Sequence, residues 1–161
     1  MSMIIDGTNG LTFNNATTQA SAGQVLQVVN SSTSTQVSSS NNTYIDTNLT
    51  ATITPKFATS KILVFVHQNG LRKTSASVDN SLGLKLLKGS TVISLLVIDS
   101  FYSGTALGIW GQTLSTSYLD SPATTSATTY KTQFACNSGT GSVVCQQDSG
   151  VSTITLMEIA Q

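Results

Sequence analysis

The residues that could do acid–base chemistry in this sequence are few and scattered. Its single histidine, His67, lies inside an apolar run, KILVFVHQ, where a general base would need a nucleophile or carboxylate beside it. The seven acidic residues are spread along the chain and form no local pair of the kind that a glycosidase uses, although a pair can be assembled from distant strands. We therefore expect His67 to be a strand residue near a loop or a subunit contact, and the chain not to be an enzyme.

Motifs for metals, cofactors and nucleic acids are also missing from the sequence. It has no phosphate-cradling glycine loop and no His/Cys set with zinc-ligand spacing, so we expect no cofactor and no metal. The formal net charge is zero and the basic residues are scattered, which predicts no nucleic-acid partner. No apolar run approaches the roughly 18 residues of a membrane span. Residues 1–5 are followed at once by Asp6 without a basic segment, so we expect neither membrane insertion nor a cleaved signal peptide.

The two cysteines, Cys136 and Cys145, flank a glycine-rich stretch. If Thr140 and Gly141 form a two-residue turn, the cysteines lie opposite each other in a non-hydrogen-bonded pair of an antiparallel hairpin. A cross-strand disulfide is then one alternative. The other is a pair of reduced thiols that act as small apolar residues, and a reducing cytoplasm favours it.

Composition indicates the kind of scaffold that positions these residues. Ser and Thr make up 49 of the 161 residues while only 9% are charged, so hydroxyl groups rather than charges keep the surface soluble. Threonine, valine and isoleucine are β-branched and suit pleated strands better than helices. The length allows one compact domain and a short appendage. The sequence therefore predicts an all-β domain.

The apolar periodicity is that of strands. In TNLTATIT the residues Leu49, Ala51 and Ile53 share one face, and KILVFVHQ is a continuous apolar run typical of a strand buried on both sides. The segments GLKLLKGSTVISLLVID and TTYKTQFACNSGTGSVVCQQ both have the pattern of hairpins, and STITLMEIA is a final strand. Within the polar stretch 30–42, Gln36-Val37 predicts a polar strand at a sheet edge or a subunit contact. We expect eight to ten strands after residue 22, arranged as a sandwich or barrel.

The N-terminal stretch DGTNGLTFNNATTQASAGQVLQVV resembles the element G-I-T-F-x-x-G-T-T-Q of bacteriophage tail fibres and other virion fibres. Residues 10–13 and 17–19 match it, and Ala16 replaces the usual glycine. The stretches TYIDTNLTATITPKFATSKILVFV, LKLLKGSTVI, YLDSPATTSATTYKTQF and STITLMEI resemble a fibre-tip domain common in marine phage genomes. The resemblance implies an N-terminal stem at 1–22 and a jelly-roll β-sandwich head at 23–161. Related heads are similar to the trimeric tumour necrosis factor and complement globular-head superfamily.

The stem has a physical reason to associate. Leu11 and Phe13 form an apolar patch in a charge-free segment that is too short to bury them, whereas three copies around an axis would bury one another's side chains. We expect a homotrimer in which this segment is a clamp or docks onto other virion proteins. A disordered tail is the alternative.

The resemblance implies a virion protein made in a bacterial cytoplasm. We expect a fibre or fibre tip that attaches the particle to a host-surface glycan or protein. Tyr102 and Trp110 are candidate receptor contacts because aromatic faces beside glycines stack on sugars, although Trp110 is also suited to the core or a subunit interface. The alternative is a capsid decoration protein that stabilises the shell, which the short stalk favours. A polysaccharide depolymerase is disfavoured by size and by the missing acid pairs.

Overall fold

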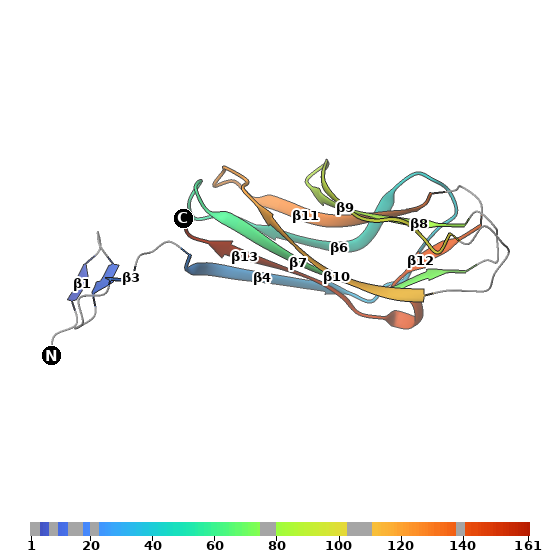
Figure 1. The fold of residues 1–161 in the computed structure, drawn as a ribbon, viewed down its shortest axis with the longest axis horizontal. Helices are drawn as coiled ribbons and strands as arrows, with labels where there is room; N and C mark the ends of the chain where they lie inside the picture. Colours follow the sequence, from blue (N-terminus) through green and yellow to red (C-terminus); the bar gives the residue numbers. More distant parts are fainter. Residues whose placement is uncertain are drawn as a thin grey trace.

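The computed structural model describes residues 23–74, 80–102, 111–137 and 141–161, together with the backbone of three short strands nearer the N-terminus. Those three strands, β1 (Ile4–Asp6), β2 (Gly10–Thr12) and β3 (Thr18–Gln19), form a small antiparallel sheet that Figure 1 shows apart from the rest. The other described elements are β4 (Val25–Thr33), β5 (Val37–Ser39), β6 (Ile45–Ile53), β7 (Lys61–Lys73), β8 (Leu82–Lys88), β9 (Thr91–Ser100), β10 (Gly111–Asp120), β11 (Thr128–Cys136), β12 (Val143–Cys145), the 3-10 turn η1 (Gln147–Ser149) and β13 (Ser152–Ile159).

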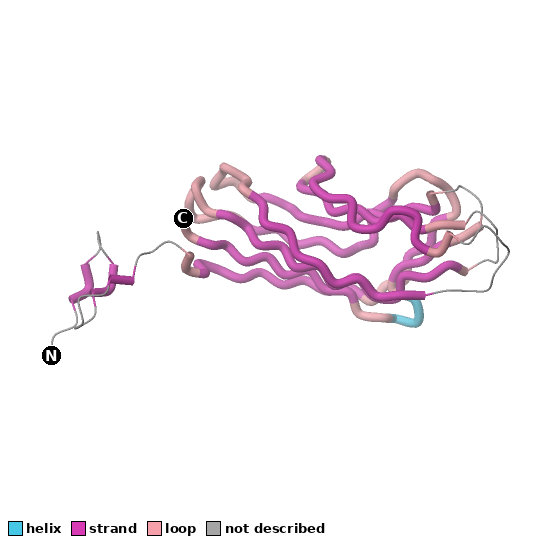
Figure 2. The backbone as a smooth tube through the Cα atoms, in the orientation of Figure 1, coloured by secondary structure: helices cyan, strands magenta, loops and turns pink. Residues whose placement is uncertain are grey.

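Two antiparallel sheets pack face to face as a sandwich (Figure 1, Figure 2). The large sheet has the order β4-β13-β7-β12-β5, and β10 pairs with the other side of β7. The small sheet has the order β6-β11-β8-β9. Counted along the chain, the eight long strands thus lie in the orders 1-8-3-6 and 2-7-4-5, which is the arrangement of a jelly roll. The all-β jelly-roll sandwich predicted from the sequence is confirmed.

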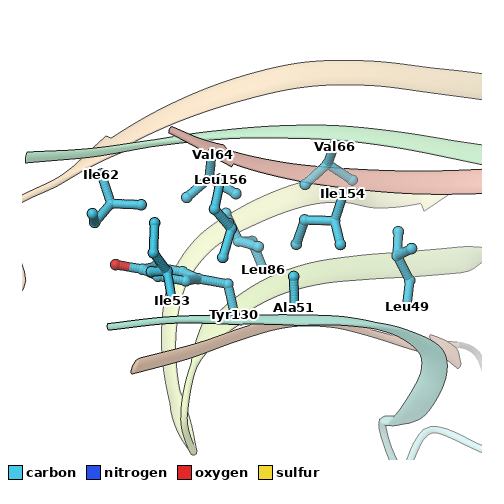
Figure 3. Close-up of a cluster of buried hydrophobic side chains, with 10 residues drawn as sticks. All are labelled: Leu49, Ala51, Ile53, Ile62, Val64, Val66, Leu86, Tyr130, Ile154 and Leu156. Carbon is cyan, nitrogen blue, oxygen red and sulfur yellow. The ribbon is translucent and has the colours of Figure 1, made fainter. Parts of the chain in front are cut away.

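The core lies between the sheets and follows the predicted alternation. Leu49, Ala51 and Ile53 of β6 all point inward and are at most 6% exposed. They meet residues of the opposite sheet such as Val64 of β7 and Leu156 of β13, as Figure 3 shows. Because side chains alternate along a strand, the threonines between the apolar residues of β6 face outward.

Strand β7 differs from its prediction. Its inward side chains, among them Ile62 and Val66, are buried, but Phe65 on the other face is 42% exposed. The continuous apolar run indicated burial on both sides, and within a single chain only one side is covered. The outer face of the large sheet has no second layer of described residues over it.

Of the two predicted hairpins, one is confirmed and one is wrong. Strands β8 and β9 pair antiparallel with Lys88 opposite Thr91, and Gly89 in the turn has φ +58°, which favours glycine. Strands β11 and β12 do not pair: Cys136 lies opposite Leu82, and β12 lies between β7 and β5 in the other sheet. The reason is that β6 and β8 already occupy both edges of β11, so the returning chain crosses to the large sheet.

The cysteines therefore do not face each other as hairpin neighbours. Both are buried and neither forms a disulfide, and both belong to one apolar cluster with Phe134 and Leu82. The Cys136 thiol donates a hydrogen bond to Asn80 Oδ1 at 3.2 Å. Burial raises the pKa of the Cys145 thiol well above its ordinary value, so this thiol stays protonated and unreactive.

The buried carboxylate of Glu158, in β13, holds the loop between β6 and β7, which connects the two sheets. Glu158 is fully buried, and its Oε1 accepts hydrogen bonds from the backbone N–H of Lys56 at 2.7 Å and of Phe57 at 3.3 Å. Its Oε2 accepts one from Gln27 Nε2. Burial alone would raise the pKa of Glu158, but these hydrogen bonds outweigh burial and hold it below its ordinary value. The carboxylate is thus a charged anchor inside the fold.

At the other side of the large sheet, β5 is an edge strand paired only with β12. Its residues Val37–Ser39 follow Gln36 in the Ser/Thr-rich stretch that predicted a polar edge strand, and this prediction is confirmed.

Candidate functional site

The sequence-predicted site residues have different outcomes. Tyr102 follows β9 and is 58% exposed. Leu11 lies in β2, and no side chain of that strand is described. Phe13 and Trp110 lie outside the described residues, so their predicted roles stay predictions. The described structure instead offers three surfaces of interest: the outer face of the large sheet, the exposed apolar side chains of β9, and a pocket at one end of the sandwich.

Register places rows of side chains across the outer face of the large sheet. The first row is apolar and crosses four strands, with Val28 and Leu119 each about half exposed. The second row is centred on Phe65, and the third on His67. In register order the three rows are Val28–Met157–Leu63–Leu119, Asn30–Thr155–Phe65–Ser117 and Ser32–Thr153–His67–Ser115. None of these twelve positions carries a carboxylate, a lysine or an arginine, and apart from Asn30 and His67 their side chains are apolar or carry a hydroxyl group.

This face is hollowed beside its exposed aromatic ring. A depression of about 410 Å³ lies between Phe65, His67, Ser117 and Thr153. The His67 ring is fixed there, since its Nδ1 hydrogen-bonds with Ser115 Oγ at 2.8 Å. The histidine is therefore a strand residue on an outward face, with a hydroxyl rather than a carboxylate as its described partner.

A second exposed apolar surface lies on β9, the edge strand of the small sheet. Val92 is 44% exposed, Leu95 55% and Ile98 67%. Strand β9 pairs only with β8, so one of its edges is open among the described strands. The two apolar surfaces belong to different sheets and have different shapes: one is a broad face and the other a ridge.

The pocket lies where β8 begins and where β9 and β11 end, at the end of the sandwich away from the C-terminus (Figure 1). It has a volume of about 270 Å³ and is lined by Ser81, Asp99, Tyr102 and Asn137. Asp99 is exposed while Ser81 is buried beneath it. An exposed aromatic ring, a carboxylate and an amide thus surround one small cavity.

A chain of hydrogen bonds orients the polar groups of this pocket. The Tyr44 hydroxyl donates to Asn137 Oδ1 at 3.0 Å, and Asn137 Nδ2 donates to Asp99 Oδ1 at 3.0 Å. Ser81 Oγ donates to the same Asp99 oxygen at 3.0 Å. Burial raises the pKa of Tyr44; the hydrogen bond with Asn137 opposes that rise and the charge of Asp99 adds to it. The phenol therefore remains a donor, which fixes the direction of the whole chain of bonds.

The backbone around the pocket is tightly constrained. Asp99 has φ +52° and Phe101 φ +74°, values that residues with side chains seldom adopt. Gly83 leaves room for the network, because a Cβ at that position would overlap the Tyr44 hydroxyl and the Asn137 side chain. Nearby, Lys85 Nζ lies 3.4 Å from the centre of the Tyr44 ring.

Sequence reasoning found Tyr102 but missed its neighbours. Tyr44 and Asn137 are 93 positions apart in the chain, and no local pattern links them. The one available signal was Asp99 at the end of a predicted strand, three residues before Tyr102.

Metal chemistry and membrane spanning find no support among these residues. Within the described ranges, no group of three or more His, Cys, Asp or Glu side chains lies close enough together to hold a metal ion. No helix in the part of the chain described here is long and apolar enough to cross a membrane.

Comparison with known proteins finds similarity in three-dimensional structure only. No protein-family model matches the chain, and no curated protein sequence matches it. Among solved structures it is similar to one of infectious bursal virus derived T=1 particles, with 13% identity and a TM-score of 0.45 over 90% of this chain and 38% of that chain. It is also similar to structures of infectious bursal disease virus strains Gx (13% identity, TM-score 0.45) and Gt (14%, 0.43), each over all of this chain. These matches cover 42% and 43% of those chains, so this chain spans less than half the length of each of these three structures.

Proposed function

We propose that this chain forms the homotrimeric head of a virion fibre and attaches the particle to its host without catalysis. The observation that carries the proposal is the three rows of side chains across the outer face of the large sheet that carry no carboxylate, lysine or arginine, with Phe65, Val28 and Leu119 exposed in the single chain. The resemblance of residues 10–19 to the element that precedes fibre heads supports the virion context.

The exposed apolar area favours an assembly rather than a monomer. A monomeric protein rarely exposes a contiguous apolar patch of this kind, whereas an interface core is apolar and poor in charges. The hollow beside Phe65 is suited to receive a side chain from a second copy. Hydroxyl groups of Thr155 and Ser117 beside Phe65, and of Thr153 in the next row, can hydrogen-bond across such an interface.

The two unlike apolar surfaces favour a closed ring. A two-fold dimer pairs a patch with itself, while an interface between different patches generates a ring when the rotation closes. The ridge of β9, with Leu95 and Ile98, and the face around Phe65 are such a pair of different patches. We infer that the ridge of each copy packs on the face of the next, with three copies around one axis.

The positions of the stem connection and of the pocket are consistent with attachment to the host through the pocket end of the sandwich. The backbone N–H of Gly23, just before β4, donates to the carbonyl of Ala160 at 2.7 Å, so the chain enters and leaves the sandwich at the same end. The pocket is lined by residues around the start of β8 and the ends of β9 and β11. Figure 1 shows these strand ends at the opposite end of the sandwich. In the proposed head the segment 1–22 joins the particle, and the pocket end faces the host.

Two measurements test this function. Sedimentation equilibrium of the purified chain should give the mass of three copies at micromolar concentration. Gold-labelled antibody raised against residues 23–161 should then label the tips of fibres on intact virions that carry the gene. Labelling spread evenly over the capsid would instead establish a decoration protein, and a monomer mass would refute the trimer.

The ring itself can be tested by mixing two variants. Phe65→Asp damages the face and leaves the ridge intact, while Leu95→Asp does the reverse. Each variant alone should be monomeric. Their mixture should form a one-to-one dimer and no larger species, because one intact ridge meets one intact face. If Leu95→Asp alone remains fully assembled, the ridge is not part of the interface.

A further inference from the structure

We propose that the pocket formed by Ser81, Asp99, Tyr102 and Asn137 binds a neutral sugar unit through two adjacent hydroxyl groups. This inference rests on the proposed attachment function and specifies its ligand. It follows from the polar groups that the pocket leaves available, from its aromatic wall and from its charge.

The polar groups match a pair of neighbouring hydroxyls. Asp99 Oδ1 already accepts bonds from Ser81 and Asn137, whereas no hydrogen bond within the described part of the chain uses Asp99 Oδ2. Asn137 Nδ2 carries two hydrogens and gives one to Asp99. A remaining acceptor and a remaining donor thus belong to two bonded side chains that line the same pocket. One sugar hydroxyl can donate to the carboxylate while its neighbour accepts from the amide.

The aromatic ring provides the apolar contact. Tyr102 lines the pocket and is 58% exposed, so its face is open to a ligand. The C–H face of a sugar ring packs on an aromatic ring, and the few polar groups then fix its orientation. The hydrogen bonds from Tyr44 and Ser81 hold the polar groups in place before a ligand arrives, which lowers the entropy cost of binding.

The charge of the pocket selects against acidic sugars. Among the described residues that line it, Asp99 alone is charged. The nearest cation in the network, Lys85, packs its ammonium over the Tyr44 ring and does not line the cavity. A carboxylated or sulfated sugar would meet the Asp99 carboxylate without a compensating cation, so the ligand should be neutral.

A single pocket of this size should bind weakly, with a dissociation constant in the millimolar range. Three pockets on one trimer would increase the apparent affinity for a dense glycan surface by about a hundredfold or more. Attachment by several weak sites is thus compatible with so small a cavity.

The test uses the full chain without any virion. A glycan array should show binding to neutral glycans and none to their sialylated or sulfated counterparts. Saturation-transfer NMR with the methyl glycoside of the best-bound sugar then measures affinity. Tyr102→Ala and Asp99→Asn should each weaken binding at least tenfold; asparagine tolerates the positive φ at this position, so the latter variant keeps the backbone. Matched controls at exposed positions outside the pocket, Phe57→Ala and Asp148→Asn, should bind like the wild type.

The outcomes separate this inference from the attachment function. No binding to any neutral glycan, equal binding by Tyr102→Ala, or preference for sialylated glycans would each overturn the sugar site. If the sugar site fails while the antibody labels fibre tips, the attachment function stands and the host ligand is a protein or binds elsewhere. If sugar binding holds while virions are not labelled, the sugar site stands and the proposed function fails.

Discussion

Replacing Phe65 by alanine should weaken the trimer strongly and leave the monomer folded. The ring is 42% exposed in the single chain. With a side-chain area of about 200 Å² for an aromatic residue, roughly 80 Å² is left for a partner to cover. At about 25 cal/mol per Å², this burial contributes about 2 kcal/mol per chain. Three equivalent sites then give about 6 kcal/mol per trimer, or roughly a 10⁴-fold change in the association constant.

For three monomers in equilibrium with one trimer, the concentration of half-dissociation varies as the square root of that constant. The expected shift for Phe65→Ala is therefore about a hundredfold toward higher concentration. Sedimentation equilibrium over a range of loading concentrations measures it directly, and far-UV circular dichroism checks the fold. The matched control is Phe57→Ala, since Phe57 is 56% exposed but lies in the loop between β6 and β7. Equal dissociation curves for Phe65→Ala and the wild type would refute the assignment of this face to the interface.

Three further predictions concern the core, the buried acid and the stem. Replacing Cys136 and Cys145 together by alanine should lower the stability by about 1 kcal/mol per site through lost packing, and melting curves of the wild type should not change on adding reductant. Because the pKa of Glu158 is lowered in the folded chain, its charged form stabilises the fold at pH values above its ordinary pKa of 4.5, and this contribution is lost as the pH falls through the lower folded-state pKa. Urea titrations at pH values from 6 to 3 should therefore show a smaller loss of stability in Glu158→Gln than in the wild type. Phe13→Asp should weaken the trimer in sedimentation while the head keeps its melting transition.

The sequence pattern alone predicted the structure correctly where the alternation of apolar residues within one strand decides which of its faces is buried. The inward set of β6 and the β8–β9 hairpin follow from spacing over fewer than twenty residues, and the structure has both. The failed hairpin shows the limit of that reasoning. A glycine-rich turn predicts a return beside the preceding strand, but β11 has no free edge to receive it. Which edges are free depends on β6 and β8, more than forty residues earlier in the chain.

The exposed face was hidden from sequence reasoning for a related reason. The sequence KILVFVHQ looks the same whether the outward side chains of the strand pack against another part of its own chain or against a second copy of the protein. Only the topology shows that none of the described strands of the same chain covers Phe65. An uncovered apolar run in a chain with 9% charged residues is therefore better explained by assembly than by a second core.

The pocket forms because the chain passes from β11 in the small sheet to β12 in the large sheet, the same crossing that made the hairpin prediction wrong. Asn137 comes directly after β11, and its backbone N–H donates to the carbonyl of Ser81 at 2.9 Å just before β8 begins. This bond holds the amide side chain beside Asp99 at the end of β9. Had the chain turned back to pair with β11, position 137 would have continued a hairpin strand instead of standing at its end. The departure from local pairing thus places the groups that we propose to bind the sugar.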